Sequence, residues 1–211
     1  MNILLFGKPG AGKGTQAPKL AEARGVPTLA TGDVLRQAVR DGTSLGKTAK
    51  EYMERGDLVP DDVILGIVGE TLAKPEYQRG VILDGVVRTV PQAEGLKKAL
   101  AGLRRKLDAV LSFEIDNAEI VRRLSTRTVC EKCQTPYTGR NAGEPCDKCG
   151  GTLVRRKDDD PDAIRNRLDV YEQQTAPVFA WYGRNGTRLA TVKAVGTVDE
   201  VTKRALKALG R

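Results

Sequence analysis

The residues best suited to chemistry are four glycines and a lysine near the amino terminus of this 211-residue chain. They lie in the segment 7–15, GKPGAGKGT, which directly follows the apolar run Asn2–Phe6 and opens a helical stretch. Glycines let the backbone curl so that several N–H groups point at one anion. The helix start adds its positive dipole end, and Lys13 adds a full charge. A turn without a ligand is the alternative, but the strand–turn–helix context favours a phosphate cradle.

The residue after the lysine restricts which classes of phosphate-binding protein fit this loop. The strict P-loop pattern has Ser or Thr there, whereas this chain has Gly14 and then Thr15. In motor proteins and signalling GTPases that hydroxyl coordinates magnesium, so Gly14 at this position disfavours both of these classes. The Gly-Lys-Gly-Thr order is similar to the loop of small kinases.

The four cysteines form a second candidate site. Cys130 and Cys133 are separated by two residues, twelve residues follow, and Cys146 and Cys149 repeat the spacing. Two such knuckles can supply all four ligands of a tetrahedral zinc ion. Because this leaves no coordination position open for a substrate or water, we predict a structural metal. Two disulfides and four unrelated thiols are the alternatives. The cytoplasmic location expected for this chain disfavours disulfides, and the paired spacing disfavours unrelated thiols.

Arginines at the edges of the predicted elements suit phosphoryl transfer, in which fixed positive charge does most of the catalysis. Arg88 closely follows a strand end at Asp84-Gly85, which places it beside the P-loop. Asp84 is placed to hold magnesium, directly or through water. A single arginine is more often a solvated surface residue. The other candidates are Arg36, Arg123, Arg127, Arg156, Arg165 and Arg167.

Elements that could position these residues alternate between short β-like runs and amphipathic helical stretches. This alternation predicts an α/β, three-layer P-loop fold with a five-stranded parallel sheet covered on both faces. The predicted strands are 2–6, 27–29, 81–84, 108–115 and 187–192. The predicted helices lie near 15–24, 61–73, 90–101, 117–126, 161–175 and 198–209.

Two stretches interrupt the alternation and are predicted as insertions above the carboxyl edge of the sheet, where open α/β folds bind ligands. The first, 30–59, contains two short helices near 33–41 and 44–55. The second, 127–159, contains the cysteines and has no helical period. The core is then formed by the segments 1–29, 60–126 and 160–211.

Composition limits the class of protein. The net charge of +8 suits an anionic partner, but a content of one Trp, five Tyr and three Phe disfavours a base-stacking platform for nucleic acid. The chain has no histidine, which excludes His-based triads, general bases and metal ligands. No apolar stretch approaches the ~20 residues of a membrane helix, and no signal-peptide pattern is present, so we expect a cytoplasmic protein. No heptad or long apolar face is visible, so we expect a monomer.

The order of the motifs resembles adenylate kinase nearly end to end. This resemblance implies the reaction ATP + AMP ⇌ 2 ADP with magnesium, in a core carrying an AMP-binding insertion and a zinc lid. The matching segments are 10–17, 31–36, 45–47, 56–61, 83–85, 88–93, 156–159 and 165–168.

The resemblance also implies roles at matching positions. The residues implied to hold ATP are Gly10, Ala11, Gly12, Lys13, Gly14, Thr15, Arg127, Pro136, Tyr137 and Val198. Those implied to form the AMP site are Thr31, Arg36, Asp57, Leu58, Val59, Gly85, Val86, Val87, Arg88, Gln92, Arg156 and Arg167. The implied catalytic residues are Lys13, Arg88, Arg127, Arg156 and Arg167. The Gln92 amide offers both a donor and an acceptor to an adenine edge.

Three positions depart from the family pattern. Val86-Val87 replaces Phe-Pro in the AMP loop, the gap between the cysteine pairs is shortened, and Thr138 stands where a histidine often follows the lid tyrosine. Two rival functions remain open. A kinase for GMP or a pyrimidine monophosphate would differ in its acceptor, although Thr31 and Gln92 favour adenine. A zinc-ribbon nucleic-acid-binding protein would leave the P-loop unexplained and would bind oligonucleotides in a salt-sensitive way.

Overall fold

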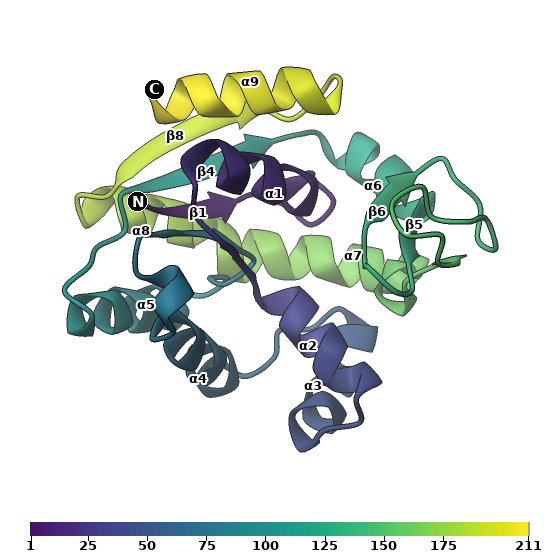
Figure 1. The fold of residues 1–211 in the computed structure, drawn as a ribbon, viewed down its shortest axis with the longest axis horizontal. Helices are drawn as coiled ribbons and strands as arrows, with labels where there is room; N and C mark the ends of the chain where they lie inside the picture. The colour runs from purple at the N-terminus through teal and green to yellow at the C-terminus, as the bar shows by residue number, and fades with distance from the viewer. Residues whose placement is uncertain (211) are drawn as a thin grey trace.

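Five parallel strands form the central sheet of the computed structural model, which describes residues 1–210 (Figure 1). Their spatial order is β2-β3-β1-β4-β8, which confirms the predicted fold class. Because β1 lies between β3 and β4, the chain leaving β1 enters the crevice at a topological switch point. The strands are β1 (Asn2–Phe6), β2 (Thr28–Ala30), β3 (Val81–Asp84), β4 (Ala109–Glu114) and β8 (Arg188–Lys193).

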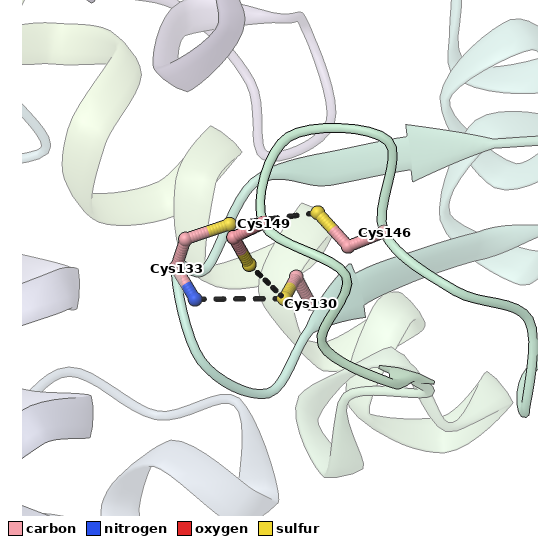
Figure 2. A group of neighbouring side chains, drawn as sticks. All are labelled: Cys130, Cys133, Cys146 and Cys149. Atoms are coloured by element: carbon pink, nitrogen blue, oxygen red, sulfur yellow. Dashed lines mark hydrogen bonds between the residues drawn. The ribbon is translucent and has the colours of Figure 1, made fainter.

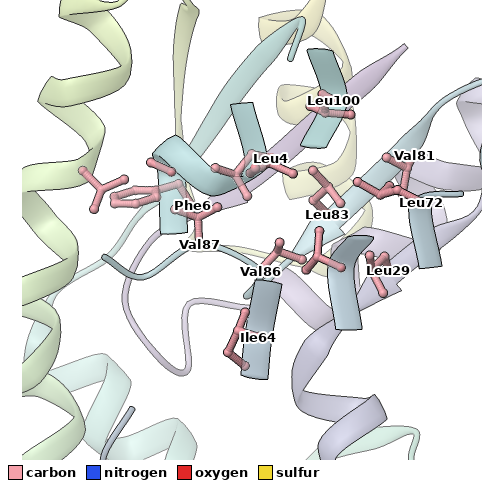
Figure 3. Packing of buried hydrophobic residues seen from close by; sticks show 14 of the residues in the cluster. Leu4, Phe6, Leu29, Ile64, Leu72, Val81, Leu83, Val86, Val87 and Leu100 are labelled. Atoms are coloured by element: carbon pink, nitrogen blue, oxygen red, sulfur yellow. The ribbon is translucent and has the colours of Figure 1, made fainter. Parts of the chain in front are cut away.

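Alternating side chains of the central strands fill two hydrophobic cores, one on each face of the sheet. Leu4 and Phe6 of β1 belong to one core, which Figure 3 shows together with Leu83. Ile3 and Leu5 point to the opposite face and belong to the other core. The first core is covered by α4 (Asp61–Leu72), α5 (Val90–Gly102) and α8 (Ala176–Arg184), and the second by α1 (Lys13–Arg24) and α9 (Val198–Leu209).

The segment after α7 (Pro161–Val170) corrects one prediction. A helix was expected to end near residue 175, but a π-helical turn, Tyr171–Thr175, leads directly into α8. Pro177 does not stop the helix because it lies in the first turn of α8, where a backbone N–H is not required. The sequence prediction missed α8 for this reason.

The two segments predicted as insertions each carry secondary structure of their own. In the first, α2 (Thr31–Arg40) and α3 (Ser44–Arg55) pack closely, since a Cβ on Gly46 would lie 2.0 Å from the Ala38 carbonyl oxygen. The second carries a small antiparallel sheet that the sequence analysis did not predict, formed by β5 (Arg127–Cys130), β6 (Pro136–Thr138) and β7 (Leu153–Val154). It follows α6 (Asn117–Ser125) and leads through a 3₁₀ turn, Lys157–Asp159, into α7. A further 3₁₀ turn, Pro75–Tyr77, precedes β3.

Candidate active site

The turn between β1 and α1 has a backbone that glycine permits. Gly7, Gly10 and Gly12 have φ angles of 128°, 80° and 93°, in the region that favours glycine. A Cβ on Gly7 would also lie 2.6 Å from the Phe113 carbonyl oxygen. The helix α1 begins immediately afterwards at Lys13, so its amino-terminal N–H groups face this turn. The geometry is that of a phosphate cradle.

Lys13 and Asp84 lie together beneath this cradle. The Lys13 ammonium donates hydrogen bonds to the carbonyl oxygens of Gly7 and Lys8, at 2.6 and 2.9 Å. Burial lowers the pKa of Lys13 to about 8, against the opposing effect of Asp84. Burial likewise raises the pKa of Asp84, and the charge of Lys13 opposes this rise. A Cβ on Gly14 would lie 3.4 Å from Asp84 Oδ2, so this carboxylate faces the start of α1.

A cleft of about 970 Å³ opens above the carboxyl edge of the sheet. It brings together arginines that are far apart in the sequence. Burial and the charge of neighbouring arginines lower the pKa values of Arg88 and Arg156, so the cleft holds positive charge that an anion would stabilise. The buried Nε atoms of Arg36 and Arg156 have no hydrogen-bond partner. The arginines lining the cleft are Arg36, Arg88, Arg122, Arg123, Arg127, Arg156 and Arg167.

Two aspartates of the 3₁₀ turn hold two of these arginines. Arg127 donates to both carboxylate oxygens of Asp159, with Nε–Oδ2 and Nη2–Oδ1 distances of 2.7 and 2.5 Å. Arg167 donates from Nη1 to Asp158 Oδ2 at 3.0 Å and to Asp159 Oδ1 at 3.1 Å. The sequence analysis did not assign a role to Asp158 or Asp159. Their only local signal was their place in the charged run after Arg156.

A smaller cavity of about 60 Å³ lies under the first insertion. Thr31 donates its hydroxyl to the Gly85 carbonyl oxygen at 2.8 Å. The Gln92 amide oxygen accepts from the Arg88 N–H at 2.7 Å, and its nitrogen donates to Asp61 Oδ1 at 2.8 Å. Gln92 therefore supports the loop that carries Arg88. The predicted residues that line this cavity are Thr31, Arg36, Asp57, Leu58, Val59, Gly85, Arg88, Gln92 and Arg167.

The remaining predicted contact residues lie in several places. Val86 and Val87 are buried in the hydrophobic core, as Figure 3 shows, and Val87 also lines the large cleft. Pro136 and Val198 line the large cleft, and the Val198 carbonyl oxygen accepts from the Gln16 amide at 2.9 Å. Tyr137 is not part of this lining. Its hydroxyl lies 3.2 Å from Cys146 Sγ instead.

The four cysteines converge on one point, as Figure 2 shows. Their sulfur atoms all lie within 4.8 Å of one another. The Cys130–Cys149 and Cys133–Cys146 sulfur distances are 3.4 and 3.6 Å, and all four cysteines are free rather than disulfide-bonded. A tetrahedral zinc site with Zn–S bonds of ~2.3 Å has sulfur–sulfur edges of ~3.8 Å, so this donor set fits zinc.

A P-loop at the switch point of a parallel sheet, an arginine-lined cleft and two insertions above it define a nucleoside monophosphate kinase. The family profile described as adenylate kinase matches residues 5–187. The chain belongs to the adenylate kinase family. Its four-cysteine cluster is consistent with the zinc-lid type within that family.

Relatives similar to this chain over its whole length carry the same family name. The adenylate kinase of Gemmatimonas aurantiaca is 59% identical over 99% of both chains. That of Syntrophotalea carbinolica is 46% identical, and that of Methanothrix thermoacetophila is 45% identical, each over 100% of this chain and 99% of its own. Within residues 1–210, no helix combines the length and apolar character needed to cross a bilayer.

Proposed function

We propose that this chain transfers the terminal phosphoryl group of ATP reversibly to AMP, giving two ADP. The observation that carries the proposal is the continuity of the site. The P-loop lines the large cleft, the first insertion lines the smaller cavity, and Arg36, Arg88 and Arg167 line both. Two nucleotides bound in these spaces would meet at their phosphate ends between the arginines.

ATP would lie in the large cleft. The backbone N–H groups of the P-loop and the Lys13 ammonium would hold its phosphates, and Arg127 would approach them from the lid. Pro136 and the backbone near Val198 would flank its base and sugar. Tyr137 was predicted beside them, but contact with ATP would require its hydroxyl to leave Cys146. The proposed ATP-binding set remains Gly10, Ala11, Gly12, Lys13, Gly14, Thr15, Arg127, Pro136, Tyr137 and Val198.

AMP would lie in the smaller cavity, whose walls would have to move apart, because about 60 Å³ is too little space for a nucleotide. Its phosphate would be directed toward Arg36, Arg88, Arg156 and Arg167. The backbone of 57–59 would form one wall of the pocket. The Gln92 amide uses one N–H and one oxygen lone pair in its bonds to Asp61 and Arg88, so its second N–H and second lone pair could bond to an adenine edge. The proposed AMP site is Thr31, Arg36, Asp57, Leu58, Val59, Gly85, Val86, Val87, Arg88, Gln92, Arg156 and Arg167.

The transfer step needs little covalent chemistry from the protein. An AMP phosphate oxygen is already ionised and attacks the γ-phosphorus while the bond to the ADP leaving oxygen breaks, so no histidine base is required. Lys13 and the arginines would stabilise the charge on the transferred group. When bound to ATP, Mg²⁺ supplies charge neutralisation, and Asp84 would hold it directly or through water. Closure of the two insertions would exclude water, which would otherwise accept the phosphoryl group.

We further propose three parts with different tasks. The segments 1–29, 60–126 and 160–211 form the core, 30–59 forms the nucleoside monophosphate insertion, and 127–159 forms the lid. Cys130, Cys133, Cys146 and Cys149 would hold a structural Zn²⁺ that stabilises the lid, which has little apolar material of its own. The chain would act as a monomer, which light scattering of the purified protein would test.

One coupled assay tests the function. ATP with Mg²⁺ is offered with AMP, GMP, CMP or UMP, and nucleoside diphosphate formation is measured. We expect AMP to be the preferred acceptor, and preference for another monophosphate would overturn the assignment. An oligonucleotide gel shift at low and high salt tests the zinc-ribbon alternative, for which we expect no specific binding.

A further inference from the structure

The end of the first insertion packs directly against α7. Gly56 ends α3 with a φ angle of 81°. A Cβ at this position would lie 2.8 Å from the Ala163 carbonyl oxygen and 2.8 Å from Arg167 Cγ. Both the backbone angle and the close approach therefore require glycine here. The corner that leads into residues 57–59 lies against the backbone of the helix that carries Arg167.

The side chain of Asn166 forms hydrogen bonds with the residues on either side of Gly56. Its side-chain amide donates to the Arg55 carbonyl oxygen at 2.9 Å and to Asp57 Oδ1 at 2.7 Å. The Asp57 carboxylate also accepts from Arg55 Nε, at 2.9 Å between Nε and Oδ2. Hydrogen bonds from Arg55 and then from Asn166 lower the pKa of Asp57, so this carboxylate is held in its charged form. One amide thus bonds to residues on both sides of Gly56.

The neighbouring residue on α7 has a different task. Arg167 lines both cavities, whereas Asn166 lines neither of them. Asp57, which Asn166 holds, is part of the lining of the smaller cavity. Arg167 therefore lines the site itself, while the adjacent Asn166 holds Asp57, a residue of its wall.

We propose that Asn166 is a positioning residue for the acceptor nucleotide. It sets the place of the 57–59 wall relative to Arg167, and so positions this wall of the acceptor pocket against the arginine proposed to bind the phosphate. This role rests on the proposed function, because it assumes that the smaller cavity receives a nucleoside monophosphate. It involves no contact between Asn166 and the nucleotide.

Titration calorimetry of the full chain with AMP alone and with ATP alone tests this inference. Asn166→Ala removes both hydrogen bonds, and we expect the Kd for AMP to rise about fivefold. The Kd for ATP should stay close to wild type, and the melting temperature should fall by only a few degrees. Asp169→Ala is the matched control, since Asp169 is exposed on the same helix and should leave both affinities unchanged.

A second pair of variants tests the hydrogen bond itself. Asn166→Asp keeps the side-chain volume but places a carboxylate against Asp57, and we expect about tenfold weaker AMP binding. Adding Asp57→Asn reverses donor and acceptor between the two side chains but leaves the Arg55 carbonyl oxygen without a donor. This double variant should therefore recover part of the affinity. A purely structural role for Asn166 would instead weaken the binding of ATP and AMP together in both variants.

The outcomes separate the inference from the proposed function. If the wild-type chain does not bind AMP, the proposed function fails. If the wild-type chain binds AMP and Asn166→Ala binds it equally well, the positioning role is overturned. Equal weakening of ATP and AMP binding, or no rescue by the double variant, would also overturn it.

Discussion

Arg127 and Asp159 form an ion pair with two hydrogen bonds that joins the first and last residues of the four-cysteine segment 127–159. The Asp159 side chain is fully buried, and Arg127 is 15% exposed. The same carboxylate also accepts a hydrogen bond from Arg167 at 3.1 Å. One acidic group therefore joins the two ends of this segment and contacts two arginines that line the cleft.

Replacing this carboxylate should affect stability and activity together. Asp159→Asn leaves Arg127 without its buried counter-charge, and we expect a loss of about 3 kcal/mol in the free energy of unfolding. The kcat should also fall, because Arg127 loses its charged partner, whereas Arg167 keeps its bonds to Asp158. Asp162→Asn is the control, since Asp162 forms an exposed pair with Arg165 and should change stability by less than about 1 kcal/mol. Urea unfolding and the coupled assay measure both effects, and wild-type values for Asp159→Asn would contradict this account.

Removing the charge of Lys13 should abolish turnover without unfolding the chain. Lys13→Met keeps a side chain of similar length in a buried position, and we expect kcat/KM to fall at least about 100-fold. Lys19→Met is the matched control on the same helix, because Lys19 forms an exposed pair with Asp199. Circular dichroism should show an unchanged fold for both variants. Near-normal ADP formation by Lys13→Met would refute the assignment of the P-loop.

The lowered pKa of Lys13 predicts a specific pH dependence. In the free enzyme this ammonium loses its proton near pH 8. The kcat/KM for ATP, which reports the free enzyme, should therefore fall as the pH rises above about 8. The corresponding profile of kcat should decline at higher pH, since bound phosphates favour the charged lysine. A flat kcat/KM up to pH 10 would contradict this prediction.

The same pKa also has a consequence for stability. Between pH 8 and the ordinary lysine value of 10.5, the unfolded chain binds a proton that the folded chain has lost. The contribution of Lys13 to the free energy of unfolding should therefore increase as the pH rises through this window. Comparing Lys13→Met with wild type in urea at pH 7.5 and 10 isolates that contribution. The free energy of unfolding of wild type relative to Lys13→Met should be higher at pH 10 than at pH 7.5, and an equal difference at both pH values would contradict this prediction.

Metal removal should destabilise the lid. We expect about one zinc per chain by elemental analysis, and removal by a strong chelator should lower the melting temperature by roughly 5–10 °C. Returning zinc to the stripped protein should restore melting, which controls for damage by the chelator. Cys146→Ser should prevent zinc retention. An unchanged melting temperature and zinc content after chelation would show that the four-thiolate site is wrong.

Much of the fold could be predicted because local patterns specify it. The alternation of apolar runs and helical stretches predicted all five strands of the central sheet, and the structure places those strands in one parallel sheet. Helix α8 was missed because a proline near a helix start and one inside a helix look alike in sequence. The lid sheet was missed because its strands β5, β6 and β7 are only two to four residues long.

The sequence by itself determined the phosphate cradle, the convergence of the four cysteines and the family, because each depends on residues at short, fixed spacings. Only the tertiary structure decided which partners hold the functional groups. Asp159 reaches Arg127 across 32 positions, and Asn166 reaches Asp57 across 109. Such pairs depend on how helices and strands pack, and packing joins residues whose separation along the chain carries no local pattern.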